Sequence, residues 1–165
     1  MKTNKFFKIL IDGLFASQLI FILGVFFNIP NGVLKINMHN SPVETWELIY
    51  WLIFFFSIIS YIFFIIALFQ LRKIAKHLLK KNYFTALIIN SLKKSGKAFV
   101  YSGIFSFSIV VISFFRRLID KTFQLTFDSD LIICLFITTI GLFLIIQSKA
   151  MLSAKELQQE NDLTI

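Results

Sequence analysis

Asp12 and Gln18 are the polar side chains best placed for chemistry inside a long apolar run. Asp12 follows Lys8 by four residues and stands directly before Gly13, where an uncharged stretch begins. Oppositely charged residues at positions i and i+4 of a helix attract one another, so we expect an ion pair between Asp12 and Lys8. A proton or cation site at Asp12 is the alternative, because an ionisable residue at membrane depth is a functional candidate by default. Gln18 is uncharged and is expected to hydrogen-bond across helices.

Other residue types that serve catalysis or metal binding do not combine into a site. His39 and His77 each lack a cysteine or a second histidine at ligand spacing. Glu44 and Glu47 are expected to lie in solvent at the start of a helix. A carboxyl group acts as a general acid where an apolar pocket raises its pKa, and the sequence indicates no such pocket here. Cys134 is a single cysteine in an apolar run, so we expect a buried, inert thiol. The sequence therefore predicts no catalytic, cofactor-binding or metal-binding residues, no cofactor, and a protein that is not an enzyme.

The elements that must position Asp12 and Gln18 are long apolar helices. The chain has 165 residues, of which 57% are hydrophobic and 16% charged, with a mean hydropathy of +0.78. A soluble domain carries roughly 25% charged residues, and crossing the hydrocarbon core takes about 20 apolar residues in a helix. We predict an all-α fold, an integral membrane four-helix antiparallel bundle that forms a single transmembrane domain over residues 1–165. The expected spans are 9–29, 46–71, 98–116 and 130–149; a signal peptide is the alternative for the first.

The distribution of positive charge predicts how these spans are oriented. Of the 17 Lys and Arg residues, all but Lys35, Arg116, Arg117 and Lys121 lie near the amino terminus, in the segment 72–97, or from Lys149 onward. Because cytoplasmic connections carry the excess of Lys and Arg, we expect both termini, the loop 72–97 and the tail 150–165 to be cytoplasmic. Topology thus accounts for the net charge of +8, and no direct contact with nucleic acid is predicted.

Small residues and local signals refine this layout. The small-xxx-small pairs Gly13/Ser17 and Ser102/Ser106 predict close helix contacts and leave a homo-oligomer open. Up to Lys81 the loop is expected to be a basic extension of the second span's helix, and Thr85 is a candidate N-cap for a short cytoplasmic helix that leads into the third span. The tail begins as a continuation of the fourth span's helix, and Asn161 and Asp162 form a helix stop. The tail has two predicted uses, folding back against the lysines of the loop 72–97 or adding to a cytoplasmic partner; a frayed end is the third reading.

Two stretches, "YFTALIINSLKKSGK" and "AKELQQENDLTI", resemble the domain-of-unknown-function family 2975. The sequence departs from that family's pattern at Lys81-Asn82-Tyr83, where the family often has Gly, Asn or Pro. The resemblance implies a small four-span protein of the bacterial plasma (inner) membrane, with no established activity. It also implies a genetic setting, since members are often encoded beside a helix-turn-helix regulator. The matching positions are Phe84, Thr85, Ile89, Leu92, Lys93, Lys94 and Gly96, then Leu157, Glu160, Asn161, Asp162, Leu163, Thr164 and Ile165.

The distinctive polar residues gather on the predicted inner face, while the bilayer core lacks reactive groups. We therefore expect a multi-pass membrane protein whose partners are the lipid bilayer and a cytoplasmic protein, in particular a helix-turn-helix regulator that it binds or modulates. A small transporter or channel subunit that uses Asp12 and Gln18 is the alternative. The residues expected to bind the partner are Phe84, Thr85, Leu92, Lys93, Lys94, Leu157, Glu160, Asn161, Asp162, Leu163, Thr164 and Ile165.

Overall fold

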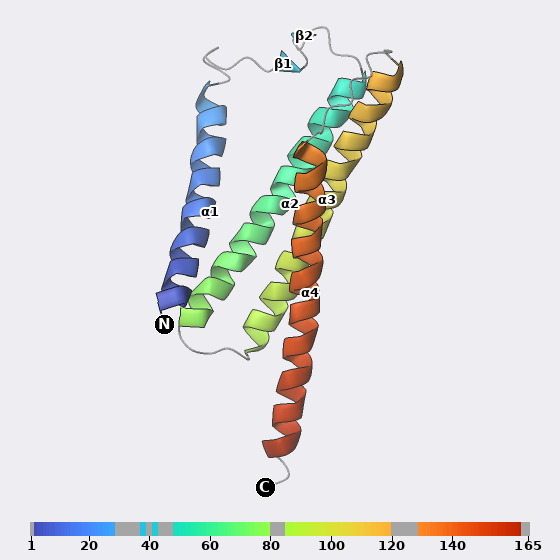
Figure 1. Cartoon of the computed structure of the whole chain (residues 1–165). Helices are drawn as coiled ribbons and strands as arrows, with labels where there is room; N and C mark the ends of the chain where they lie inside the picture. The colour runs from blue at the N-terminus through green and yellow to red at the C-terminus, as the bar shows by residue number, and fades with distance from the viewer. Residues whose placement is uncertain are drawn as a thin grey trace.

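Four long helices dominate the computed structural model (Figure 1). The structure describes residues 2–28, 37–38, 41–42, 48–79, 85–119 and 129–162. The helices are α1 (Lys2–Asn28), α2 (Leu48–Leu79), α3 (Ala86–Ile119) and α4 (Ser129–Asp162). Two short strands, β1 (Asn37–Met38) and β2 (Ser41–Pro42), pair antiparallel between α1 and α2. The predicted all-α class is confirmed.

Each helix contains a stretch long and apolar enough to cross a membrane. These stretches are Asn4–Val25, Leu48–Leu79, Ala86–Arg117 and Ser129–Asn161. Helices are the natural form for such runs, because a helix satisfies all its backbone hydrogen bonds internally where no water is present. At 1.5 Å per residue, the 34 residues of α4 extend for about 51 Å, which exceeds the roughly 30 Å of hydrocarbon. The chain therefore has the architecture of a multi-pass membrane protein whose helices continue beyond the bilayer.

The basic segment between the second and third apolar runs is mostly helical. α2 continues to Leu79, as its basic extension predicted. α3 begins after Thr85, whose backbone carbonyl accepts hydrogen bonds from the amides of Ile88 at 3.0 Å and Ile89 at 3.2 Å. The short helix expected before the third span is present as the first part of α3, because residues 86–97 and the third apolar run belong to one uninterrupted helix. The reason is that Ile88 and Leu92 lie on the buried face that continues at Ala98 and Phe99, with no break in helical phase.

Three of the helices share the core and one lies beside them. Ala67 and Leu68 of α2 form a buried cluster with Ala98 and Phe99 of α3, and side chains of α4 pack against it. A second cluster joins Ile74, Ile88 and Leu92 to partly buried residues of α4 that include Met151. In contrast, α1 packs mainly against α2 and stands apart from α3 and α4 (Figure 1). The core is thus formed mainly by three helices, and α1, attached mainly through α2, adds Phe15 to the first cluster.

Small residues bring the backbones of α3 and α4 into close contact. A Cβ atom added at Gly96 would lie 2.6 Å from the carbonyl oxygen of Gly141 and 2.7 Å from Cγ1 of Ile145. One added at Gly141 would lie 2.8 Å from the carbonyl oxygen of Gly96. Small residues permit this approach between membrane helices. The close contact predicted at Gly13 is not made within the described chain, because nothing lies within 4 Å of the corresponding position.

Candidate functional site

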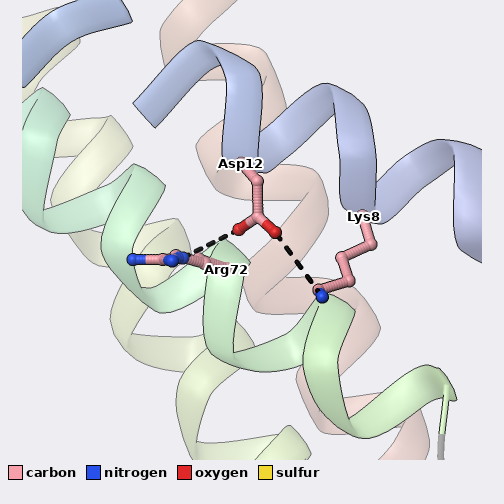
Figure 2. A network of polar contacts seen from close by, with 3 residues as sticks. All are labelled: Lys8, Asp12 and Arg72. Atoms are coloured by element: carbon pink, nitrogen blue, oxygen red, sulfur yellow. Dashed lines mark hydrogen bonds and ion pairs between the residues drawn. The ribbon is translucent and has the colours of Figure 1, made fainter. Parts of the chain in front are cut away.

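Asp12 is held between two cations at the interface of α1 and α2. Figure 2 shows its carboxylate between Lys8 and Arg72, with Oδ1 2.7 Å from Arg72 Nε and Oδ2 3.7 Å from Lys8 Nζ. The predicted pair with Lys8 is confirmed. Arg72 was not predicted as a partner, although it is the first charge after the second apolar run and Asp12 is the last before the uncharged part of the first.

The environment of Asp12 suits a structural ion-pair cluster between α1 and α2. The side chains of Lys8, Asp12 and Arg72 are 39%, 31% and 50% exposed, so none is isolated in an apolar interior. The Arg72 guanidinium also lies over the Phe15 ring, 5.4 Å from its centroid. Two cations around one carboxylate leave this cluster with a net positive charge. The arrangement links α1 to α2 through Arg72.

Gln18 forms the hydrogen bond across helices that its uncharged side chain predicted. Tyr61 of α2 donates from its hydroxyl to Gln18 Oε1 at 2.8 Å. Phe21 of α1 meets the same tyrosine ring edge-on, with centroids 6.4 Å apart. Asp12 and Gln18 therefore both serve the contact between α1 and α2, and the structure does not bring the two side chains into one site.

A serine cluster lies at the middle of the contact between α2 and α3. Ser60 donates a hydrogen bond to the backbone carbonyl of Ser102 at 2.9 Å, and its hydroxyl lies 2.9 Å from that of Ser106. These side chains line a hollow of about 310 Å³, together with Ser57, Tyr61, Phe64, Ile109 and Ile137. The lining offers hydroxyl groups and apolar surface, without a carboxylate, imidazole or amine. It can hold a molecule by hydrogen bonding and apolar contact.

Metal ligands are not grouped in the described ranges. Among residues 2–28, 37–38, 41–42, 48–79, 85–119 and 129–162, no three His, Cys, Asp or Glu side chains lie together. Cys134 is 1% exposed, so its predicted burial is confirmed. Its thiol donates to the backbone carbonyl of Leu131 at 3.1 Å.

The predicted partner-binding residues of α3 occupy different surroundings. Leu92 is 7% exposed and belongs to the second core cluster, so its side chain is not part of the outer surface. The Thr85 hydroxyl is buried, with no hydrogen-bond partner in the described part of the chain, although its backbone starts the helix. Lys93 and Lys94 are exposed, and Phe84 lies outside the described residues.

The predicted tail residues extend α4. The helix runs without interruption to Asp162, so of the three readings of the tail, folding back on the loop is not found for residues 150–162. The reason is that Gln158, Gln159 and Glu160 are good helix formers that continue the helical register set by the core. Leu157 is 63% exposed, and Glu160 and Asn161 are exposed as well. Leu163, Thr164 and Ile165 lie outside the described residues.

The two predicted parts of the inner face are separated along the molecule. Gly96, two residues after Lys94, lies against Ile145 of α4. From Ile145, Leu157 lies about 18 Å further along α4 at 1.5 Å per residue. Figure 1 shows this end of α4 projecting past the ends of α2 and α3. The lysines of α3 and the end of α4 are therefore two surfaces within the described residues.

Comparison with known proteins identifies a family. A family model described as "Protein of unknown function (DUF2975)" matches residues 34–165. No curated protein and no solved structure matches the chain. The matched range includes α2, α3 and α4, the three helices that form most of the core, and all of α1 lies before it.

Proposed function

The chain belongs to the DUF2975 family of proteins of unknown function, and from this premise we propose that it docks a cytoplasmic protein on the projecting end of α4. In this proposal the protein is a multi-pass component of the bacterial plasma membrane. Its helices alternate in direction, with both termini in the cytoplasm. The docked protein is a regulator, and a helix-turn-helix protein is its expected form. The proposal assigns no reaction to the chain.

The observation that supports docking is the exposed apolar stripe at the end of α4. Met151 is the last residue of α4 that packs against a core cluster, and the helix continues for about 16 Å beyond it at 1.5 Å per residue. Ala150, Ala154 and Leu157 are all exposed, and their spacing places them on one side of the helix. A helix that presents apolar residues at i, i+4 and i+7 is suited to a groove on a partner protein.

Charge beside the stripe favours a partner with a basic rim. Glu156 and Glu160 are exposed on the same projecting segment. Complementary charge at the edge of an interface speeds association and selects against wrong partners. The predicted partner therefore has an apolar groove bordered by Lys or Arg, and a DNA-binding regulator is a natural source of such a surface.

Photo-crosslinking in living cells tests the proposal. A photoreactive amino acid at position 157 or 154 is expected to give one discrete crosslinked product with a cytoplasmic protein. The matched control is Gln159, which is exposed on the same segment and points to the other side of the helix. Crosslinking that is absent at 154 and 157, or equally strong at 159, contradicts docking through the stripe.

The serine-lined hollow supports a second candidate, a small transporter or channel subunit. Its hydroxyl groups, from Ser60 and its neighbours, lie among long apolar helices, where polar side chains often mark a pathway. This candidate requires flux across reconstituted vesicles, and Ser106→Leu, which places a bulkier apolar side chain in the hollow, is expected to abolish that flux. Vesicles in which the chain produces no flux of ions or small solutes would contradict it.

A further inference from the structure

One face of α3 carries three exposed lysines at the depth of the apolar helices. Lys93, Lys94 and Lys97 are exposed, together with Asn90. Their spacing places all four on one side of the helix, and we call this set the lysine face. The opposite side is buried against the neighbouring helices through Ser91, Leu92 and Ser95. The lysine face is therefore the outward side of α3.

Contacts on the buried side of α3 give the depth of this face. Ser95 donates a hydrogen bond to the backbone carbonyl of Ala67 at 3.0 Å, which sets it level with that part of α2. Gly96 lies against Ile145 of α4. Around this level the other helices expose apolar side chains, among them Ile66 of α2 and Phe143 and Ile146 of α4. The lysines thus stand at the edge of the apolar belt, where Gln147 of α4 and Arg72 and Lys73 of α2 are exposed as well.

Nothing in the described chain neutralises these lysines. The ion pairs among the described residues are those of Asp12, so no described carboxylate lies within 4.0 Å of the lysine face. A charged side chain at bilayer depth is costly, and lysines near helix ends extend toward the headgroups to reduce that cost. Three of them on one face concentrate positive charge at a single point of the membrane boundary.

We propose that the lysine face binds the headgroup of an anionic phospholipid through Lys93, Lys94 and Lys97. The lipid belongs to the inner leaflet, which rests on the orientation in the proposed function. Its phosphate oxygens accept hydrogen bonds from the lysine ammonium groups. Its chains lie along the apolar continuation of the same face, at Tyr101 and Ile104, which are both exposed. A tyrosine one turn above the lysines suits the interface between headgroups and hydrocarbon.

A lipid fits this position better than a cytoplasmic protein. The lysine face has exposed apolar side chains at its own level on α2 and α4, and those require hydrocarbon around them. The docking stripe, by contrast, lies on the part of α4 that projects past the other helices (Figure 1). The two surfaces therefore take different partners.

Native mass spectrometry of the full chain tests the proposal. The protein is released from lipid discs of phosphatidylcholine and phosphatidylglycerol, and the retained lipids are counted. The unsubstituted chain is expected to retain phosphatidylglycerol in preference to phosphatidylcholine. The triple variant K93Q/K94Q/K97Q is expected to lose this retention by about tenfold or more, given the strength of lysine attraction to anionic lipid. The control K5Q/K76Q/K155Q removes the same charge further from the apolar belt, near the amino end of α1 and the carboxyl ends of α2 and α4, and is expected to retain the lipid.

Two further arms make the result specific. K93R/K94R/K97R keeps the charge and is expected to retain phosphatidylglycerol, which guards against a loss caused by misfolding. Inorganic phosphate added in place of the lipid is expected not to bind. Equal retention by K93Q/K94Q/K97Q and the control, or equal retention of the two lipids by the unsubstituted chain, would overturn the proposal. Crosslinking from position 157 reports on the docking proposal alone, so the failure of one is distinguishable from the failure of the other.

Discussion

Adding one methyl group at Gly96 should disrupt the packing of α3 on α4. In Gly96→Ala the new Cβ would lie 2.6 Å from the carbonyl oxygen of Gly141 and 2.9 Å from the backbone nitrogen of Ile145. Ordinary van der Waals contact begins at 3.4 Å. Two of the opposing atoms belong to the backbone of α4, so a side-chain rotation cannot relieve the overlap. The helices must separate locally, and their dispersion contacts weaken as they do.

The size of the effect follows from two opposing contributions. Overpacking a close contact costs about 1–3 kcal/mol. Replacing glycine by alanine within a helix contributes up to about 1 kcal/mol in favour of the folded state. Gly13→Ala gains the helix propensity of alanine without the cost of overpacking, since nothing lies within 4 Å of its Cβ position. The difference between the two variants isolates the packing cost, and we expect Gly96→Ala to be less stable than Gly13→Ala by about 1–3 kcal/mol.

Reversible unfolding in mixed micelles measures this difference. Increasing mole fractions of a denaturing detergent unfold each variant, and far-UV circular dichroism follows the loss of helix. Gly141→Ala should behave as Gly96→Ala does, because its Cβ would meet the carbonyl oxygen of Gly96 at 2.8 Å. If Gly96→Ala proves as stable as Gly13→Ala, the close contact between α3 and α4 does not hold the core together and the reasoning is refuted.

Two smaller effects test the polar contacts. Ser60→Ala should lower the free energy of unfolding by about 0.6–1.7 kcal/mol, the range for hydrogen bonds between membrane helices, because it breaks the link to Ser102. Ser57→Ala, which loses only a bond to the Ile53 carbonyl of its own helix, should cost less, and equal losses in the two would contradict the assignment. Asp12→Asn should change the free energy of unfolding by less than about 1 kcal/mol, since its ion pairs are partly exposed and screened. A larger loss of unfolding free energy in the same titration would contradict this and show that the ion pairs of Asp12 dominate the attachment of α1.

The elements could be predicted from the sequence because each signal is local. Four long apolar runs specify four helices wherever water is absent, and the basic extension of α2 and the start of α3 after Thr85 follow from residues a few positions apart. The pair between Lys8 and Asp12 was predictable for the same reason, as it spans one helical turn.

The contacts between helices could not be predicted, because hydropathy records neither the level nor the rotation of one helix against another. Nothing local to Asp12 indicates Arg72, and nothing local to Gly96 indicates Gly141. The attachment of α1 mainly through α2 could not be predicted for the same reason, since its apolar run resembles those of the core helices. The tail differs, because its residues left three readings open. Residues 150–162 are good helix formers that continue α4 to Asp162, but nothing local to them indicates what the end of the helix contacts.

Cysteine accessibility in intact cells tests the central claim, that the projecting end of α4 lies in the cytoplasm of a membrane-spanning chain. Native Cys134 is 1% exposed, and the unsubstituted chain measures its background labelling by a membrane-impermeant maleimide. A cysteine at position 159 should be labelled only after the cells are permeabilised. One at position 129, the other end of α4, should be labelled without permeabilisation. Labelling of position 159 in intact cells would contradict the account.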